Sequence, residues 1–373
     1  MSLQQHLPVL LVVLPLLSAP LTVLLRNRTL AFGVVCAASW VGLVISILIW
    51  QQVQVSGTIS YEIGSWAPPL GIEYRVDQLS AFVLVLVSAI AALVVPYSRA
   101  SIETEVPTEQ HYLFYTMFAL CLTGLLGITI TGDAFNIFVF LEVSSLATYV
   151  LIALGQNRRA LLASYQYLIM GTIGATLLVI GIGFLYLMTG SLNLVDISNR
   201  LGDLNASRPV LVALAFITVG VSLKLALFPL HQWLPNAYTY APSSVSSFLA
   251  ATATKVAIYV LLRFYFSVFD HTIIFGALPL QAILMALALA GMFAASTIAI
   301  FQSDLRRLFA FSSVGQVGYI ILGMALNSVN GVTSSVLHLF NHGITKGAIF
   351  MLLGIVSLRL GGVQLSQLNG LAK

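Results

Sequence analysis

Residues 165–189, YQYLIMGTIGATLLVIGIGFLYLMT, decide the fold, because they form a long apolar run without one charged side chain. About 20 consecutive apolar residues in an α-helix cross the hydrocarbon layer of a bilayer, so this run predicts a transmembrane helix. The whole chain has the same character: 59% of its 373 residues are hydrophobic and 8% are charged. Soluble domains carry about 25% charged residues, so the composition excludes an ordinary soluble protein.

Further apolar runs lie on both sides of this one and predict an all-α integral membrane protein with about 11 transmembrane helices. The other spans are expected at residues 7–25, 30–50, 79–96, 112–131, 134–154, 210–228, 246–269, 278–300, 308–326 and 332–358. Residues 51–77 mix aromatic, Gly, Pro and alternating residues, which indicates an extended or hairpin-like extramembrane loop. In the connection 191–209, apolar residues recur at helical spacing, which favours a helix lying along the membrane surface.

The distribution of basic residues predicts the orientation, because loops on the inner side of a membrane are enriched in Lys and Arg. With the N-terminus outside and the C-terminus inside, the inner loops hold nine basic residues and the outer loops hold four. The inner set is Arg26, Arg28, Arg99, Arg158, Arg159, Arg306, Arg307, Arg359 and Lys373, and the outer set is Arg75, Arg200, Arg208 and Arg263. We therefore expect N-out, C-in topology.

Several classes of function have no support in the sequence. The basic residues never cluster into a run, which argues against a nucleic-acid partner. Cys36 and Cys121 lie inside apolar segments and are interpreted as small core residues. There is no Cys cluster, P-loop or dinucleotide fingerprint, so we predict no cofactor and no bond-making active site in this chain. Membership in a larger redox enzyme stays open. The N-terminus lacks the basic region of a cleavable signal, so we expect its apolar run to remain as the first span.

Six Glu, His and Lys residues fall inside the predicted spans: Glu142, Lys224, Lys255, His338, His342 and Lys346. A charge near the bilayer centre costs on the order of 3 kcal/mol, so each one needs a reason. Lysine, histidine and glutamate can all exchange a proton when they are desolvated. The Glu and the three Lys residues fall near the middle of their spans, which predicts a row of proton carriers at one depth.

Each member of this row also has a passive interpretation. Glu142 could be a structural partner for a buried lysine. Lys224 could extend its ammonium toward the interface from a proline-kinked helix. Lys255 lies among small and hydroxyl residues, which could hydrogen-bond a passive amine.

Two sequence patterns favour the active interpretation. Pro229, Pro235 and Pro242 follow Lys224 closely and predict that the seventh helix is broken, as helices that line polar cavities in membranes often are. His338, His342 and Lys346 recur at every fourth position, which places them on one helical face about 6 Å apart. A metal or haem at the histidine pair is the alternative, but the neighbouring ammonium opposes a cation and no third ligand is evident.

Five strings of sequence carry a resemblance to a known family: TGDAFNIFVFLEVSSLATY, SLKLALFPLHQWLPNAY, YAPSSVSSFLAATATKVAIYVLLR, SDLRRLFAFSSVGQVGY and HLFNHGITKGAIF. They resemble the antiporter-like membrane subunits shared by respiratory complex I, membrane-bound hydrogenases and Mrp-type multisubunit sodium/proton antiporters, with the greatest similarity to the D-type Mrp subunit. The resemblance implies that Glu142 pairs with Lys224 and that Lys255 hands protons on. It further implies that His338, His342 and Lys346 continue the path.

The resemblance also implies an architecture of two inverted five-helix repeats. We expect an N-terminal three-helix region at 1–111, a complete first repeat at 112–270 that contains helices four to eight, and a second repeat at 271–373. Only helices nine to eleven of the second repeat fall within the sequence, so the chain is expected to lack the family's C-terminal helices.

Three functional hypotheses follow. The first is a proton-translocating subunit of a multisubunit monovalent cation/proton antiporter, multi-pass in a bacterial inner (plasma) membrane, with other membrane subunits as partners and protons and Na⁺ as candidate ions. The second is the proton-pumping membrane subunit of a complex I-like NADH:quinone oxidoreductase or a membrane-bound hydrogenase. The third is a truncated, non-conducting scaffold.

Overall fold

The computed structural model describes residues 3–204, 207–277 and 279–368, and within these ranges eleven helices are long and apolar enough to cross a membrane. The predicted fold class is confirmed. Lys373 and residue 278, the predicted start of the ninth span, lie outside the described residues.

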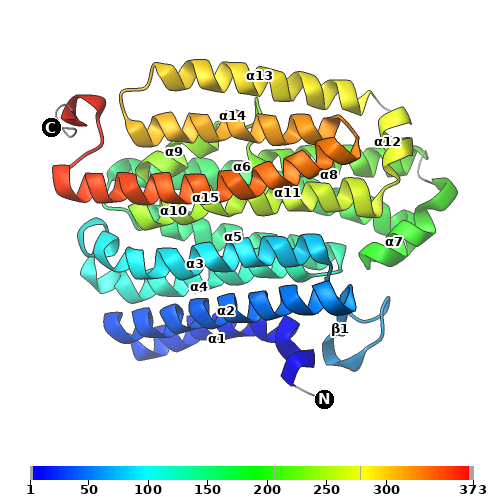
Figure 1. The fold of residues 1–373 in the computed structure, drawn as a ribbon, viewed down its shortest axis with the longest axis horizontal. Helices are drawn as coiled ribbons and strands as arrows, with labels where there is room; N and C mark the ends of the chain where they lie inside the picture. The colour runs from blue at the N-terminus through cyan, green and yellow to red at the C-terminus, as the bar shows by residue number, and fades with distance from the viewer. Residues whose placement is uncertain (1–2, 205–206, 278, 369–373) are drawn as a thin grey trace.

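The elements alternate in direction along one bundle axis, apart from a hairpin and short helices at its ends (Figure 1). The helices that form the spans are α1 (Leu7–Leu25), α2 (Arg28–Ser56), α3 (Gln78–Glu105), α4 (His111–Ile130), α5 (Ala134–Ala153), α6 (Arg158–Thr189), α8 (Arg208–Leu225), α10 (Ser243–Ala251), α11 (Ala253–Arg263), α13 (Leu280–Ile300), α14 (Leu305–Ala325) and α15 (Val329–Leu360). The shorter elements are β1 (Ile59–Glu62), β2 (Glu73–Val76), α7 (Leu194–Leu201), α9 (Trp233–Tyr240), α12 (His271–Ala277), a π-helical turn at Phe264–Val268, and 3₁₀ turns at Leu3–His6, Ile63–Ser65, Thr108–Gln110, Gly202–Leu204 and Leu365–Leu368.

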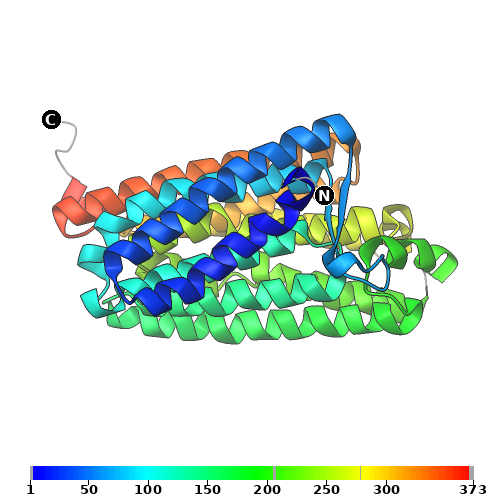
Figure 2. The same ribbon diagram turned by 90° about the horizontal axis from the view of Figure 1, so that it is seen from below.

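The helices form layers around a central pair, α10 and α11 (Figures 1 and 2). In the most apolar stretch of 18 residues within Ser243–Val268, 94% of the residues are buried. The corresponding share in α13, at the edge of the bundle, is 28%. α10 packs against α3 and α15, and α11 packs against α4 and α8. α1 and α2 lie together on the opposite side of the bundle from α13, as Figure 1 shows. The sequence segment around Lys255 therefore occupies the core.

Polar caps set the starts of several helices, and some helices continue past their predicted spans. Asp77 accepts a hydrogen bond from the Ser80 amide at the start of α3, and Asp304 accepts one from the Arg307 amide at the start of α14. α3 continues through Pro96 to Glu105, although the predicted span ended at 96. The apolar run detects only the length within hydrocarbon, whereas the hydrogen-bonded helix continues for polar turns beyond it.

Two of the spans are broken inside the bundle. The predicted break in the seventh helix is confirmed: α8 ends at Leu225, Ala226 is left-handed with φ 59°, and α9 starts at Trp233. The eighth span, predicted at 246–269, is also interrupted. It breaks at Thr252, where φ is −123° and ψ is −54°. Neither Gly nor Pro lies at this position, so the sequence carried no ordinary signal for the break.

Residues 51–56 of the predicted loop 51–77 continue α2, and the rest forms the expected hairpin, in which β1 and β2 pair antiparallel with Ile59 opposite Val76. The carbonyl of the buried Glu73 accepts a hydrogen bond from the Gly132 amide at 3.0 Å. Its carboxylate accepts one from Asn193 Nδ2 at 2.7 Å. The hairpin therefore joins the connection before α5 to the connection after α6. A helix, α7, also forms where the sequence predicted one.

The two predicted repeats have a common local geometry. Asp133, at the start of α5, forms an antiparallel bridge with Asn193 just after α6. Asp304, at the start of α14, forms the same bridge with Gln364 just after α15. This likeness supports the correspondence of α5 and α6 with α14 and α15, while the repeat boundaries remain predictions.

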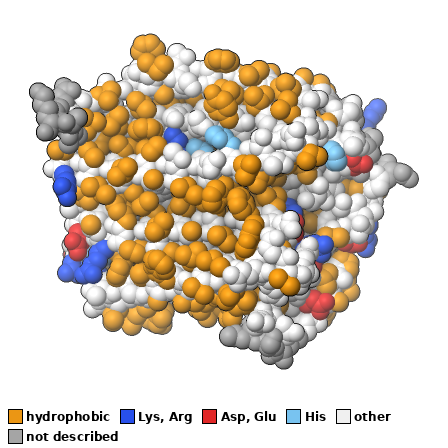
Figure 3. Space-filling view, viewed as in Figure 1, with side chains coloured by type: hydrophobic (Ala, Val, Ile, Leu, Met, Phe, Trp, Pro, Cys, Tyr) orange, Lys and Arg blue, Asp and Glu red, His pale blue; other side chains and the backbone are white. Residues whose placement is uncertain are grey.

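Apolar side chains cover the middle of the visible face, and charged side chains gather at its two ends (Figure 3). Leu187 and Phe293 are 73% and 71% exposed although both are strongly apolar. Such a surface suits contact with lipid around the sides of the bundle and with water at its ends. The chain is thus a multi-pass membrane protein, and its N-out orientation remains a prediction.

Candidate functional site

Glu142 and Lys224 form an ion pair between α5 and α8. The Lys224 Nζ lies 3.7 Å from Glu142 Oε1, and it donates a hydrogen bond to Ser145 Oγ at 2.8 Å. The lysine side chain is 5% exposed and the glutamate side chain is 24% exposed. Lys224 stands in the last turn of α8, directly before the break. The lysine therefore lies beside the interruption of the seventh span, where the chain turns away from the helix.

A glycine on α6 makes room for this pair. A Cβ at Gly171 would lie 2.0 Å from Tyr149 Oη and 3.3 Å from Lys224 Nζ. Tyr149 packs edge-on against Tyr167, with ring centroids 4.9 Å apart, and Tyr167 stacks on Trp233 at 4.0 Å. The aromatic cluster therefore forms a wall near the Lys224 ammonium, and the lack of a side chain at Gly171 leaves the space that Tyr149 and Lys224 occupy.

Lys255 lies at the break of the eighth span and is fully buried. Its Nζ donates to the carbonyl oxygen of Ala250 and, at 3.3 Å, to Thr254 Oγ1. In an unbroken helix the Ala250 carbonyl would accept from the amide four residues ahead. The break at Thr252 takes that amide away and leaves the carbonyl to the lysine. Within the described part of the chain, no carboxylate forms an ion pair with Lys255.

His338, His342 and Lys346 stack along α15, as their spacing predicts. The two histidine rings are parallel, with centroids 6.2 Å apart. His338 Nε2 is hydrogen-bonded to Gln316 Oε1 at 2.6 Å, and neither ring nitrogen of His342 has a hydrogen-bond partner among the described residues. In Figure 3, histidine side chains show in a gap in the apolar surface over α14 and α15.

The lysine of this ladder is held by α14. Lys346 Nζ donates to the Phe309 carbonyl at 3.1 Å and to Ser312 Oγ at 2.9 Å, and it lies 5.2 Å from the centre of the Phe309 ring. α15 also reaches the Thr252 break, because a Cβ at Gly343 would lie 3.1 Å from the Ala251 carbonyl oxygen. The ladder and Lys255 are therefore on adjoining helices.

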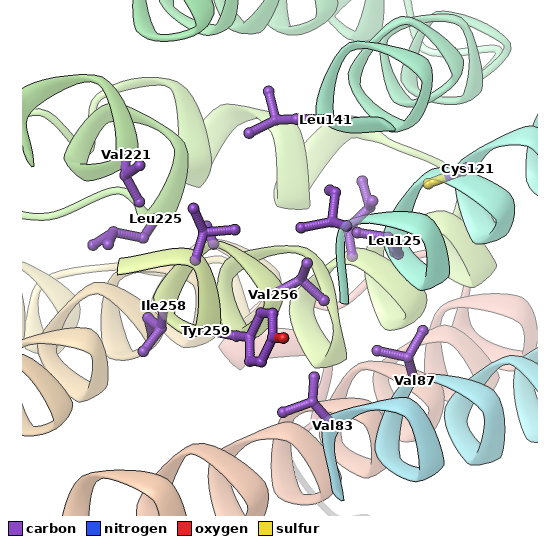
Figure 4. Close-up of a cluster of buried hydrophobic side chains, with 14 of the residues drawn as sticks. Val83, Val87, Cys121, Leu125, Leu141, Val221, Leu225, Val256, Ile258 and Tyr259 are labelled. Atoms are coloured by element: carbon purple, nitrogen blue, oxygen red, sulfur yellow. The ribbon is translucent and has the colours of Figure 1, made fainter. Parts of the chain in front are cut away.

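A small cavity of about 30 Å³ separates Lys224 from α11. Ser144, Ser145 and Thr148 line its α5 side. Leu125 of α4 and Val256 of α11 line other sides of it, and both belong to the buried hydrophobic cluster drawn in Figure 4. A cavity needs roughly 10–15 Å³ to hold one water, so this one has room for about two. Its hydroxyl lining supplies the partners that such waters need.

The structure brings the predicted residues into two groups, with one residue between them. Glu142 and Lys224 are in contact, and His338, His342 and Lys346 form a ladder. Lys255 contacts neither group through a hydrogen bond in the described chain. Of the three predicted prolines, Pro229 lies in the break, Pro235 lies in the first turn of α9, and Pro242 immediately precedes α10. Among the described residues there is no group of three His, Cys, Asp or Glu side chains placed to hold a metal ion.

Several residues of the site were missed from the sequence. Ser145 and Gln316 are polar side chains inside apolar spans, a signal that could have nominated both. The carbonyls of Ala250 and Phe309 carry no signal in the sequence, because any residue has one. Gly171 could be recognised only once α6 was seen against α8.

Ion pairs at the two ends of the bundle were also missed. Arg263 donates to Asp77 at one end, and Arg306 Nη2 lies 3.3 Å from Glu105 Oε1 at the other. Partial burial raises the pKa of Asp77, but hydrogen bonds from Arg263 and Ser80 and the Arg263 charge outweigh it, so that its pKa lies below the usual value.

Comparison with known proteins identifies the family of the chain. The family model described as NADH:quinone oxidoreductase/Mrp antiporter, TM, matches residues 131–373. The chain is 42% identical over 372 residues to NADH-quinone oxidoreductase subunit N of Desulforudis audaxviator, covering 99% of this chain and 73% of that protein. It is 30% identical over 366 residues to the D-type Na(+)/H(+) antiporter subunit of Bacillus subtilis, covering 97% of this chain and 72% of that protein.

A solved structure gives the same result. A chain of the Mrp complex from Dietzia sp. DQ12-45-1b superposes with a TM-score of 0.89 at 28% identity, covering 100% of this chain and 68% of that one. The similarity extends over the helices that carry both groups of titratable residues. The chain therefore belongs to the family of NADH:quinone oxidoreductase and Mrp antiporter membrane subunits.

Proposed function

We propose that this chain is the proton-translocating subunit of a multisubunit monovalent cation/proton antiporter in a bacterial plasma membrane. The observation that carries the proposal is the Glu142–Lys224 pair, whose ammonium and carboxylate are 3.7 Å apart inside the bundle. Relatives named as Na(+)/H(+) antiporter subunits come from bacteria and support both the activity and the membrane. The partners are other membrane subunits, and the ions are protons and a monovalent cation such as Na⁺.

The pair acts as an electrostatic switch in this proposal. At an effective dielectric constant near 20, two unit charges 3.7 Å apart attract each other by roughly 4 kcal/mol. A proton that arrives on Lys255 adds a positive charge beyond the hydroxyl-lined cavity. It favours release of a proton from Lys224, because like charges disfavour each other's ionised forms. Waters in the cavity would carry the proton between the two lysines.

A second candidate function is favoured by one observation, the 42% identity to an NADH-quinone oxidoreductase subunit N. In this case the same proton carriers would belong to the pumping arm of a redox-driven complex. The two candidates differ in the driving force. An antiporter generates a pH gradient when Na⁺ or K⁺ is added to vesicles, whereas a redox pump generates one when an electron donor and a quinone are added.

The test uses inverted membrane vesicles that contain the complete complex, with proton movement followed by quenching of a pH-sensitive dye. Glu142→Gln and Lys224→Ala should each reduce cation-driven proton flux by at least tenfold, because either change removes one half of the switch. Glu142→Asp keeps the carboxylate and should restore part of the flux.

Glu109→Gln is the matched control, because Glu109 is an exposed carboxylate outside the helices of the pair. It should leave the flux unchanged. Wild-type flux in both Glu142→Gln and Lys224→Ala would overturn the switch. A pH gradient that appears only on adding an electron donor would decide for the redox-driven candidate.

A further inference from the structure

A second, much larger cavity lies away from the proton carriers, between α6, α9, α13 and α14. Its volume is about 700 Å³, within the range of roughly 300–1,000 Å³ that is typical of ligand pockets. Tyr165 and Ile169 of α6 and Ile298 of α13 line it and are 58%, 42% and 37% exposed. The cavity is therefore open at the side of the bundle, where the surface is apolar and faces lipid.

An unpaired cation stands in the wall of this cavity. The Arg307 guanidinium donates one hydrogen bond, from Nη1 to Asn236 Oδ1 at 3.1 Å, and lies 5.8 Å from the centre of the Phe311 ring. It forms no ion pair with a carboxylate of the described chain, whereas its neighbour Arg306 pairs with Glu105. A guanidinium has five N–H donors, so most of those on Arg307 remain for a ligand.

A buried polar atom points to the same cavity. His231 lines it, is 8% exposed, and has no hydrogen-bond partner for Nδ1 in the described structure. Its ring is held between Phe228, at a centroid distance of 5.2 Å, and Phe311, at 6.3 Å. Buried polar atoms are nearly always hydrogen-bonded, so the Nδ1 of His231 is available to a polar group that enters the cavity.

Charge and apolar surface are separated along the cavity in the way an amphiphile requires. Arg307 lies in the first turn of α14, at the end of the bundle where Arg306 meets Glu105. Met170 lies twelve residues into α6, about 18 Å along the helix from that end. The cation is thus at headgroup depth, and the apolar lining continues toward the bilayer centre. A soluble anion would match the cation but leave this lining uncovered.

We propose that this cavity binds an anionic phospholipid from the surrounding leaflet. The phosphate accepts hydrogen bonds from Arg307, an acyl chain lies along Ile169, Met170 and Ile298, and His231 Nδ1 meets a polar group of the glycerol ester region. Basic pockets between transmembrane helices are a recurrent form of lipid headgroup site. The site is independent of the proton carriers and goes beyond the proposed transport activity.

Native mass spectrometry of the purified full chain with added lipids tests the site. The probes are phosphatidylglycerol and phosphatidylcholine with identical acyl chains. Wild type should bind phosphatidylglycerol roughly tenfold more tightly, the size expected of charge-assisted hydrogen bonds. Arg307→Gln should abolish this preference. Ile298→Trp should weaken binding of both lipids by filling the apolar mouth while the charge remains, and it keeps the test decisive if Arg307→Gln does not fold.

Arg158→Gln is the matched control, since Arg158 is an exposed arginine at the start of α6 and does not line the cavity. It should retain the preference for phosphatidylglycerol, and excess inorganic phosphate should not compete with the lipid. Equal binding of the two lipids by wild type, or equal losses in Arg158→Gln and Arg307→Gln, would overturn the proposal. Because the readout is lipid binding, failure of the transport hypothesis leaves this result unaffected.

Discussion

The three buried lysines differ in what holds their ammonium groups. Lys224 has a carboxylate, Glu142, together with a hydroxyl. Lys255 and Lys346 are held by a backbone carbonyl and a hydroxyl each. A carbonyl or hydroxyl oxygen accepts hydrogen bonds from an amine as well as from an ammonium and favours the charged form modestly, whereas a carboxylate favours it strongly. The Glu142–Lys224 pair is therefore the place where a change of charge alters the interaction energy most.

A second residue-scale feature is the Asp77–Arg263 pair, in which Arg263 Nη1 donates to Asp77 Oδ2 at 2.6 Å while Asp77 also caps α3. Asp77→Asn keeps the capping oxygen and removes the charge. We expect it to lower the free energy of unfolding at pH 7 by about 1–2 kcal/mol, because Arg263 is left buried without its partner. Thermal unfolding in detergent would measure the change.

The effect of Asp77→Asn should depend on pH. The pKa of Asp77 is lowered in the folded chain. The stability that its ionised form contributes is therefore complete above the unfolded pKa of about 4 and is lost as the pH falls through the lower folded value. The melting temperatures of wild type and Asp77→Asn should converge below about pH 4. Asp196→Asn, which removes the pair with the exposed Arg200, is the control and should cost less than about 0.5 kcal/mol.

At the scale of the elements, interrupted helices supply polar groups where an intact helix would offer none. The break after Leu225 leaves Lys224 in the last turn of α8, and the break at Thr252 releases the Ala250 carbonyl to Lys255. A free carbonyl at membrane depth must find a donor, and each break provides one in a nearby side chain or backbone group. The indole of Trp233 donates to the Leu223 carbonyl at 2.9 Å for the same reason.

A prediction at this scale concerns α6, which approaches α5 and α8 closely at Gly171. Gly171→Ala would place a Cβ 2.0 Å from Tyr149 Oη, so the tyrosine or the helix must move. We expect a loss of about 1–3 kcal/mol in stability and reduced proton flux, because the walls around Lys224 shift. Melting temperature and vesicle flux would be measured together.

Gly183→Ala is the control on the same helix. Gly183 is exposed, and a Cβ there would have no heavy atom within 4 Å. It should leave flux intact and hold or raise stability, since alanine favours a helix over glycine by roughly 0.5–1 kcal/mol. Equal effects from the two substitutions would show that the space at Gly171 is not required.

At the scale of the whole molecule, Glu105 joins three parts of the fold. At the end of α3, its Oε2 accepts from the Ser243 amide at the start of α10, at 2.7 Å. Its Oε1 accepts from Ser243 Oγ at 2.6 Å and from Arg306 of α14 at 3.3 Å. One carboxylate thus links the N-terminal helices, the central helix and the second predicted repeat.

Glu105→Ala should accordingly destabilise the whole bundle. We expect a loss of about 3 kcal/mol, because the substitution leaves Arg306 unpaired and the start of α10 without its acceptor. Glu103→Ala, two residues earlier on the exposed side of α3, should change stability by less than about 0.5 kcal/mol. Unfolding followed separately near α3 and near α14 should show one shared transition in wild type and two in Glu105→Ala. A single, unshifted transition in Glu105→Ala would contradict this role.

The sequence by itself determined the number and position of the spans, the hairpin at 51–77, the break after Lys224, and the identity of the buried titratable residues. These features depend on the composition and spacing of residues along the chain. A long apolar run is stable within the bilayer as a spanning helix, and a charged residue within such a run is costly and therefore easy to recognise. Tertiary structure alone decided the break at Thr252, the carbonyl partners of Lys255 and Lys346, the need for glycine at Gly171, and the cavity beside Arg307. Each of these depends on which helix faces which. Every residue has a backbone carbonyl, so the sequence does not indicate which carbonyl binds a lysine. Likewise, the sequence does not indicate which glycine is required, because that depends on the group that packing places against it.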